Sequence, residues 1–217
     1  GESVVMPLNV NEIFYSIQGE SLDAGRPCVF VRLTGCNLRC AWCDTRYAYD
    51  QGRDMPLAGV LEQVAAYGCP LVEITGGEPL LQGRTPELAR ELIRAGHQVL
   101  VETNGTRDLR DLPSECVKIV DIKCPSSGES GRHRPDILEQ LASRDQVKFV
   151  IADRTDYLFA SAFSRNIRDM PPGNILFSPV GDVLSAATLA DWILTDHLEV
   201  RLQVQLHRII WKGERGK

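Results

Sequence analysis

The chain has 217 residues, of which 43% are hydrophobic and 24% are charged, an ordinary composition for a globular domain. This length suffices to bury a full core, so residues 1–217 are expected to form a single domain. The formal net charge of −5 argues against a protein that coats nucleic acid or binds an anionic membrane, because such proteins carry clustered basic residues.

The sequence shows neither an apolar run long enough to span a bilayer nor a secretory signal. Its seven cysteines are an odd number and form no paired framework, which is typical of a reducing compartment. We therefore expect a cytoplasmic protein. Cys28 and Cys116 lie in apolar, strand-like runs and are expected to be buried as small hydrophobic residues.

Short apolar runs alternate with helical patterns along the chain. After an extended entry segment at 11–15, the runs predict seven strands, at 29–33, 71–75, 98–102, 116–120, 146–151, 175–177 and 201–205. Apolar residues at helical spacing predict helices at 57–67, 135–141, 157–167 and 186–194, and a further helix that Thr85 caps and Pro86 begins. This alternation indicates an α/β fold with a parallel sheet and crossover helices.

Polar or glycine-rich clusters follow six of the predicted strands, at 36–45, 75–79, 102–106, 121–123, 178–180 and 205–207. The carboxyl ends of parallel strands meet at one edge, where α/β barrels and open sheets bind their ligands. One such cluster would be unremarkable, because strand ends and turns are commonly polar. Six together predict a single site spread across a barrel mouth.

Three cysteines, Cys36, Cys40 and Cys43, follow the first predicted strand with the spacing C-x-x-x-C-x-x-C. Four thiolates would close a tetrahedral structural site, but no fourth cysteine or histidine follows at a matching spacing. Three thiolates can hold three irons of a four-iron cluster and leave the fourth iron open, as a reactive site requires. A zinc site with a distant fourth ligand, or three core cysteines, is the alternative.

Arg32 interrupts the apolar run at 29–33. Strand alternation places it on the same face as Phe30 and Thr34. If this face looks into a barrel, the guanidinium must meet a carboxylate, which belongs either to a ligand or to the protein itself. Lys123, at another strand end, likewise needs a partner for its charge.

The cysteine loop after a first strand, with Trp42 before the third cysteine, resembles the radical S-adenosylmethionine enzymes. The stretch Ser-Ile-Gln-Gly-Glu at 16–20 and the Cys-Asp-Thr at 43–45 are similar to the 7-carboxy-7-deazaguanine synthase family. The resemblance runs from about residue 11 to residue 207. It implies a partial parallel β/α barrel with a 4Fe-4S cluster at its top, held by Cys36, Cys40 and Cys43.

The resemblance also implies which residues hold the ligands. S-adenosyl-L-methionine would be bound by Trp42, Cys43, Asp44, Gly77, Glu78, Asn104, Asp121, Ile122, Lys123, Ser178, Pro179 and Val180, with the glycines letting the backbone approach it. The substrate, 6-carboxy-5,6,7,8-tetrahydropterin, would be surrounded by Ile17, Gln18, Gly19, Glu20, Arg32, Thr75, Glu102 and His207. Thr45 would bind a Mg²⁺ that also contacts the substrate carboxylate.

In the implied reaction, an external flavodoxin- or ferredoxin-like donor supplies the electron that cleaves S-adenosylmethionine. The resulting 5′-deoxyadenosyl radical takes a hydrogen from C6 of the pterin, whose ring contracts with loss of ammonia. No side chain is needed as a base in the first step, although Glu20 or His207 could handle later protons. The open sheet edges of a partial barrel favour a homodimer.

Two other functions remain open from the sequence. One is an activase that generates a glycyl radical on a partner protein, which would need a wide mouth and a docking surface. The stretch at 16–20 and Arg32 favour a small anionic substrate instead. The other is a non-catalytic iron–sulfur or zinc protein, which would not need six polar clusters at one edge.

Overall fold

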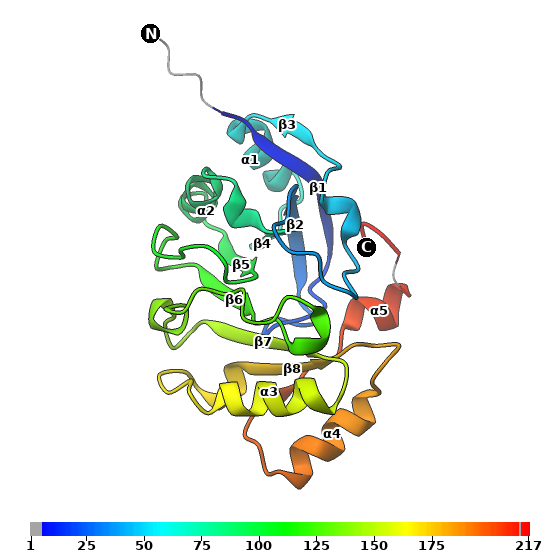
Figure 1. Cartoon of the computed structure of the whole chain (residues 1–217). Helices are drawn as coiled ribbons and strands as arrows, with labels where there is room; N and C mark the ends of the chain where they lie inside the picture. Colours follow the sequence, from blue (N-terminus) through cyan, green and yellow to red (C-terminus); the bar gives the residue numbers. More distant parts are fainter. Residues whose placement is uncertain (1–5, 213) are drawn as a thin grey trace.

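A nine-stranded sheet organises the molecule, with the strand order β3-β1-β2-β4-β5-β6-β7-β8-β9 (Figure 1). The computed structural model describes residues 6–212 and 214–217. The strands are β1 (Leu8–Ile17), β2 (Pro27–Leu33), β3 (Arg53–Met55), β4 (Leu71–Gly76), β5 (Gln98–Thr103), β6 (Val117–Asp121), β7 (Gln146–Ile151), β8 (Ile175–Pro179) and β9 (Arg201–Leu202).

Five α-helices are described, namely α1 (Leu57–Ala65), α2 (Thr85–Arg94), α3 (Arg154–Ser164), α4 (Ala186–Thr195) and α5 (Leu206–Trp211). Short 3₁₀ turns lie at η1 (Arg46–Ala48), η2 (Pro79–Leu81), η3 (Pro125–Ser127), η4 (Leu138–Gln140) and η5 (Pro172–Asn174). Within the described part of the chain, none of the helices combines the length and apolar character that a membrane span needs.

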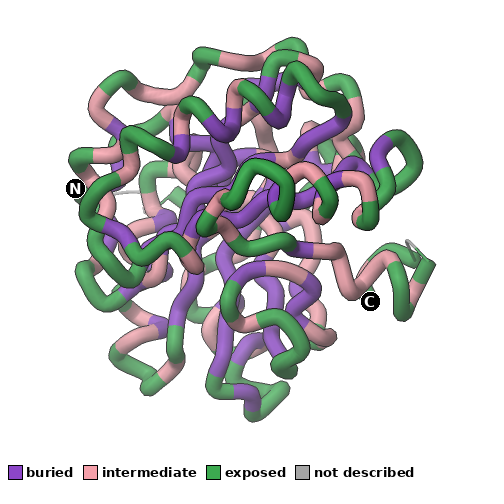
Figure 2. Tube along the Cα trace, turned by 90° about the horizontal axis from the view of Figure 1, so that it is seen from below, coloured by how far each residue is buried: buried purple, intermediate pink, exposed green. Residues whose placement is uncertain are grey.

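The seven strands from β2 and β4 to β9 run parallel, as the alternation of strands and helices predicts. The outer face of the sheet is covered by helices, and its inner face lines a cavity, which gives a partial β/α barrel (Figure 1). Figure 2 shows the buried residues concentrated in the central strands and the exposed ones in the surrounding loops. Strands that are buried on both faces have nearly continuous apolar sequences, which is why these strands could be predicted.

The antiparallel edge of the sheet was not predicted. Residues 11–15 belong to the ten-residue strand β1, which pairs antiparallel with both β2 and the short strand β3. The polar residues Asn9, Asn11 and Glu12 weaken the strand signal in β1. A three-residue strand such as β3 carries too few residues to show alternation.

Three helical predictions need correction. The stretch at 135–141 forms only the single 3₁₀ turn η4, at the end of a segment in which Arg134 and Gln140 both donate to Asp136. Thr85 is the first helical residue rather than the cap, because its hydroxyl donates to the Pro79 carbonyl at 2.5 Å. Helix α3 starts before residue 157, because the Asp153 side chain accepts from the Asp156 amide at 2.8 Å.

The last predicted strand is also shorter than expected. Only Arg201 and Leu202 pair with β8, and the chain then leaves the sheet and enters α5 at Leu206. His207 therefore lies in the first turn of a helix rather than after a strand end.

Candidate active site

A cavity of about 460 Å³ lies against the inner face of the curved sheet. Side chains of β1, β2 and β4 to β8 contribute to its wall, together with the cysteine loop and the segment around α5. Most of the predicted site residues line it: Ile17, Gln18, Gly19, Glu20, Arg32, Cys36, Cys40, Trp42, Cys43, Asp44, Thr45, Thr75, Gly77, Glu102, Asn104, Asp121, Lys123, Pro179, Val180 and His207.

The three motif cysteines lie in the loop between β2 and η1, and all three are free thiols that face the cavity. Burial raises the pKa of the Cys36 and Cys40 thiols. In residues 6–212 and 214–217, no three Cys, His, Asp or Glu side chains converge on one point as a single metal ion would require. Ligands of an iron–sulfur cluster bind separate irons, so three thiolates on one short loop suit such a cluster.

The glycine pair at the end of β4 seats this cysteine loop. A methyl group on Gly77 would lie 2.3 Å from the Gly35 carbonyl oxygen and 2.6 Å from Cys36 Cβ. On Gly76 it would lie 2.3 Å from the Leu33 carbonyl oxygen. The pair is therefore required for close packing of the loop on β4, and Gly77, a predicted cofactor contact, also lines the cavity.

The side chains of three predicted cofactor contacts lie outside the cavity wall. Glu78 is fully buried outside the cavity wall, and its carboxylate accepts from Thr103 Oγ1 at 2.8 Å and from the Asn104 amide at 2.7 Å. It thus joins the ends of β4 and β5 instead of facing an ammonium group. The side chains of Ile122 and Ser178 are also fully buried and outside the wall, because strand alternation turns them away from the cavity.

The residues after β1 lie at the amino end of the parallel strands, because β1 runs antiparallel to them. Gln18 Nε2 donates to Glu73 at 2.5 Å, and the Leu22 amide donates to the Gln146 side chain at 3.0 Å, at the start of β7. The loop at 18–22 therefore closes the amino end of the partial barrel, while the cysteine loop lies at the carboxyl end.

Residues 18–22 are joined to residues 203–207, and we call these two segments together the closing seam. The Ser21 amide donates to Gln203 at 2.7 Å, and the Leu206 amide donates to the Gly19 carbonyl at 3.0 Å. A side chain at position 19 would collide with the His207 ring, since a methyl group there would lie 2.1 Å from Nδ1. The seam thus brings together Gln18, Gly19, Glu20 and His207, all predicted substrate contacts.

Arg32 lines the cavity and already has a protein partner. Its Nε donates to Glu12 at 2.9 Å, and its guanidinium lies 5.8 Å from the centroid of the Tyr47 ring. Burial opposes the charge, but Tyr47 and Glu12 outweigh it and raise the pKa of Arg32. Of the two partners that the sequence left open, the structure shows the internal carboxylate.

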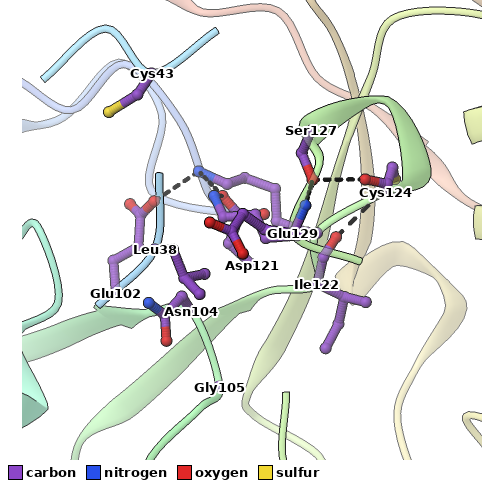
Figure 3. A network of polar contacts seen from close by, with 12 residues as sticks. Leu38, Cys43, Glu102, Asn104, Gly105, Asp121, Ile122, Cys124, Ser127 and Glu129 are labelled. Carbon is purple, nitrogen blue, oxygen red and sulfur yellow. Dashed lines mark hydrogen bonds and ion pairs between the residues drawn. The ribbon is translucent and has the colours of Figure 1, made fainter. Parts of the chain in front are cut away.

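A network of buried charges crosses the inner face of the sheet (Figure 3). Lys148 Nζ lies 2.6 Å from Glu102, 3.4 Å from Glu20 and 3.8 Å from Asp121. Lys123 Nζ donates to Asp121 at 2.7 Å. Burial opposes the charge of Lys148, but the carboxylates outweigh it and raise its pKa well above the ordinary value.

Comparison with known proteins gives the family. The model of the radical SAM superfamily matches residues 30–123. A 7-carboxy-7-deazaguanine synthase of Koribacter versatilis is 45% identical to this chain, over 95% of this chain and 98% of the length of that synthase. The synthase of Chlorobaculum tepidum is 43% identical over 98% of each.

The chain belongs to the 7-carboxy-7-deazaguanine synthase family. The crystal structure of QueE from Escherichia coli is similar in fold, with a TM-score of 0.76 over 92% of this chain and 94% of that one. At 23% identity, this likeness supports the partial barrel only.

Two residues at the centre of this family member's cavity were missed from the sequence. Lys148 interrupts the apolar run of β7, and Glu73 interrupts that of β4, as Arg32 does in β2. Burial raises the pKa of Glu73 well above its ordinary value, and Glu102 adds to the effect. The signal used for Arg32, a charge inside an apolar strand, would have identified both residues.

Proposed function

We propose that this member of the synthase family converts 6-carboxy-5,6,7,8-tetrahydropterin to 7-carboxy-7-deazaguanine with loss of ammonia. One observation carries the proposal: a single cavity is lined at one end by the three-cysteine loop and at the other by the closing seam, and Arg32 lines the same cavity. The names of the relatives at 43–45% identity support the same reaction.

In this proposal the cavity wall offers the pterin several hydrogen-bond acceptors and one cation. The carboxylates of Glu20 and Glu102 accept from N–H groups of the ring, and the Gln18 amide offers both a donor and an acceptor. Arg32 pairs with the substrate carboxylate, because a guanidinium with five donors can hold Glu12 and a ligand together. Thr75 and His207 complete the wall around the ring.

Cys36, Cys40 and Cys43 would hold a 4Fe-4S cluster beside bound S-adenosyl-L-methionine. Among the described residues, Asp121 Oδ1 is buried in the cavity wall without a hydrogen-bond partner, which suits a donor group of that cofactor. When bound, the cluster and S-adenosylmethionine supply the radical that starts the reaction. The protein excludes water and orients the pterin against the cofactor.

Thr45 would hold the Mg²⁺ of this proposal. Its hydroxyl lines the cavity beside the cysteine loop, 3.7 Å from Cys43 Sγ. A hard cation prefers such oxygen donors and shares its remaining positions with water and substrate oxygens.

The proposed partners are an external flavodoxin- or ferredoxin-like electron donor and a second copy of the chain in a homodimer. The activase alternative is not favoured, because the curated relatives that cover nearly the whole chain are synthases.

An anaerobic assay tests the reaction. The cluster is reconstituted, S-adenosylmethionine, dithionite, Mg²⁺ and the carboxylated pterin are added, and products are followed by mass. We expect 7-carboxy-7-deazaguanine together with 5′-deoxyadenosine. 5′-Deoxyadenosine without the deazapurine would retain the radical chemistry and reject the pterin as substrate.

A further inference from the structure

Lys148 is the buried cation at the centre of the cavity wall. It lies in the middle of β7, its side chain is 4% exposed, and its ammonium contacts Glu102 of β5 at 2.6 Å. The same ammonium reaches Glu20 of the closing seam at 3.4 Å. A single cation therefore joins two carboxylates of the same cavity wall, one from β5 and one from the closing seam.

Titratable groups face Lys148 from several parts of the wall. Strand β4 contributes Glu73, and β6 contributes Asp121, which is shared with Lys123. Strand β8, on the other side, carries no titratable side chain. Glu102 is thus the closest partner of Lys148, with Glu20 second.

Both carboxylates keep acceptor capacity for a ligand. Glu102 meets Lys148 through Oε1, which leaves Oε2 for a further donor. Glu20 Oε1 accepts from the side-chain amides of Gln205 at 3.1 Å and Gln203 at 3.4 Å, whereas its Oε2 has Lys148 as its one partner among the described residues and keeps a site for a ligand. Each carboxylate oxygen has two acceptor sites, so one contact does not saturate it.

We propose that Lys148 is a positioning residue for pterin recognition, a role that rests on the proposed function. Its ammonium holds Glu20 and Glu102 side by side as hydrogen-bond acceptors. Two adjacent carboxylates can then accept from adjacent N–H donors of the aminopyrimidinone edge of the substrate. Without the cation they repel each other in a buried site, so the acceptor pair is lost.

Kinetics of Lys148→Met test this role against a matched control. Lys118→Met removes another buried lysine, whose Nζ lies 3.6 Å from Asp145 outside the cavity. We expect Lys148→Met to raise KM for the pterin by about tenfold with a smaller loss in kcat, and Lys148→Arg to recover part of it. Lys118→Met should leave KM within about twofold even where it lowers stability. Equal changes in KM for the two methionine variants would overturn the proposal.

A double-mutant cycle gives a second kinetic test. If Lys148 acts through Glu102, Lys148→Met should raise KM less in the Glu102→Gln background than in the wild type. The double variant also removes one charge of each sign, which preserves the buried charge balance if Lys148→Met alone does not fold. Fully additive effects on KM would contradict the inference.

Crystal structures of the full chain separate this inference from the proposed function. In Lys148→Met, we expect the Glu20 and Glu102 carboxylates to turn apart while the backbones of β5 and β7 stay in place. Unmoved carboxylates would overturn the positioning role. If they move but the wild type does not convert the pterin, the charge arrangement stands and the proposed substrate is wrong.

Discussion

Glu12 of β1 and Arg32 of β2 are direct cross-strand partners joined by an ion pair, and Arg32 lines the cavity. The Glu12 carboxylate also accepts from the Tyr47 hydroxyl at 3.0 Å and from Arg215 Nε at 3.4 Å. Arg32 is therefore oriented by the protein before any ligand arrives. A fixed guanidinium loses less conformational freedom on binding an anion than a mobile one.

Replacement of Arg32 tests whether it binds substrate. Arg32→Ala should raise KM for the carboxylated pterin by about ten- to a hundredfold, through loss of a charge-assisted hydrogen bond. Glu12 keeps Tyr47 and Arg215 as partners, so the fold should survive. Arg94→Ala, in an exposed pair on α2, is the control in the same steady-state assay. An unchanged KM would leave Arg32 only its internal salt bridge.

Gly77→Ala tests the seating of the cysteine loop. The added methyl group would collide with the Gly35 carbonyl and with Cys36, so the loop must shift. We expect a loss of about 1–3 kcal/mol in the free energy of unfolding and reduced cluster absorbance after reconstitution. Gly83→Ala is the matched control, because a methyl group there meets nothing within 4 Å. Full cluster loading in Gly77→Ala would show that the loop tolerates displacement.

Glu73 should make stability depend on pH. Burial, reinforced by Glu102, raises its pKa in the folded chain, so its contribution is complete below the unfolded-state pKa of about 4.3. That contribution is lost as pH rises from there through the raised folded-state pKa. The amide side chain in Glu73→Gln does not titrate, so it makes no such pH-dependent contribution. The free energy of unfolding of the wild type relative to Glu73→Gln should therefore fall with rising pH, by up to about 1.4 kcal/mol per unit.

Urea denaturation between pH 5 and about pH 8 measures this dependence. Glu62→Gln, on an exposed position of α1, serves as the control and should show no comparable slope. If the difference in the free energy of unfolding between the wild type and Glu73→Gln stays constant across this range, Glu73 is already ionised in the folded chain.

Cys40→Ala tests the cluster ligands. Removal of one of three thiolates should abolish the iron–sulfur absorbance after reconstitution and, with it, cleavage of S-adenosylmethionine. Cys116→Ala removes a buried thiol outside the cavity and should leave the spectrum intact. Retention of the full cluster absorbance in Cys40→Ala would remove this residue from the ligand set.

Thr45→Ala tests the Mg²⁺ site. Loss of the hydroxyl should raise the Mg²⁺ concentration needed for half-maximal turnover while binding of S-adenosylmethionine changes less, because only the cation loses a direct ligand. Titration of activity with Mg²⁺ and equilibrium binding of the cofactor give the two readings. An identical Mg²⁺ response in both proteins would exclude Thr45 from the site.

The sequence predicted the parallel part of the fold well. The apolar runs that become β2 and β4 to β8 are buried on both faces, so their signal is continuous. The edge strands β1 and β3 were missed or shortened because partial exposure dilutes that signal. Register could not be predicted either, and it decides which charges face one another across the inner wall.

In the candidate site, too, local features could be predicted from the sequence and long-range contacts could not. The cysteine loop and the strand-end motifs are local in sequence, so their positions could be read directly. The partners of Glu78 could not, because its three hydrogen bonds depend on how η2 meets the end of β5. Lys148 and Glu102 are 46 positions apart, and only the sheet order brings them together.

The closing seam has a consequence for the order of events during synthesis. Ser21 and Gln203 are 182 positions apart in the chain, and Glu20 and Gln205 are 185 apart. A chain that grows from its amino terminus completes the cysteine loop and β4 long before residues 203–207 emerge. We therefore expect iron–sulfur assembly on the nascent chain to become possible before the closing seam has formed the amino end of the cavity.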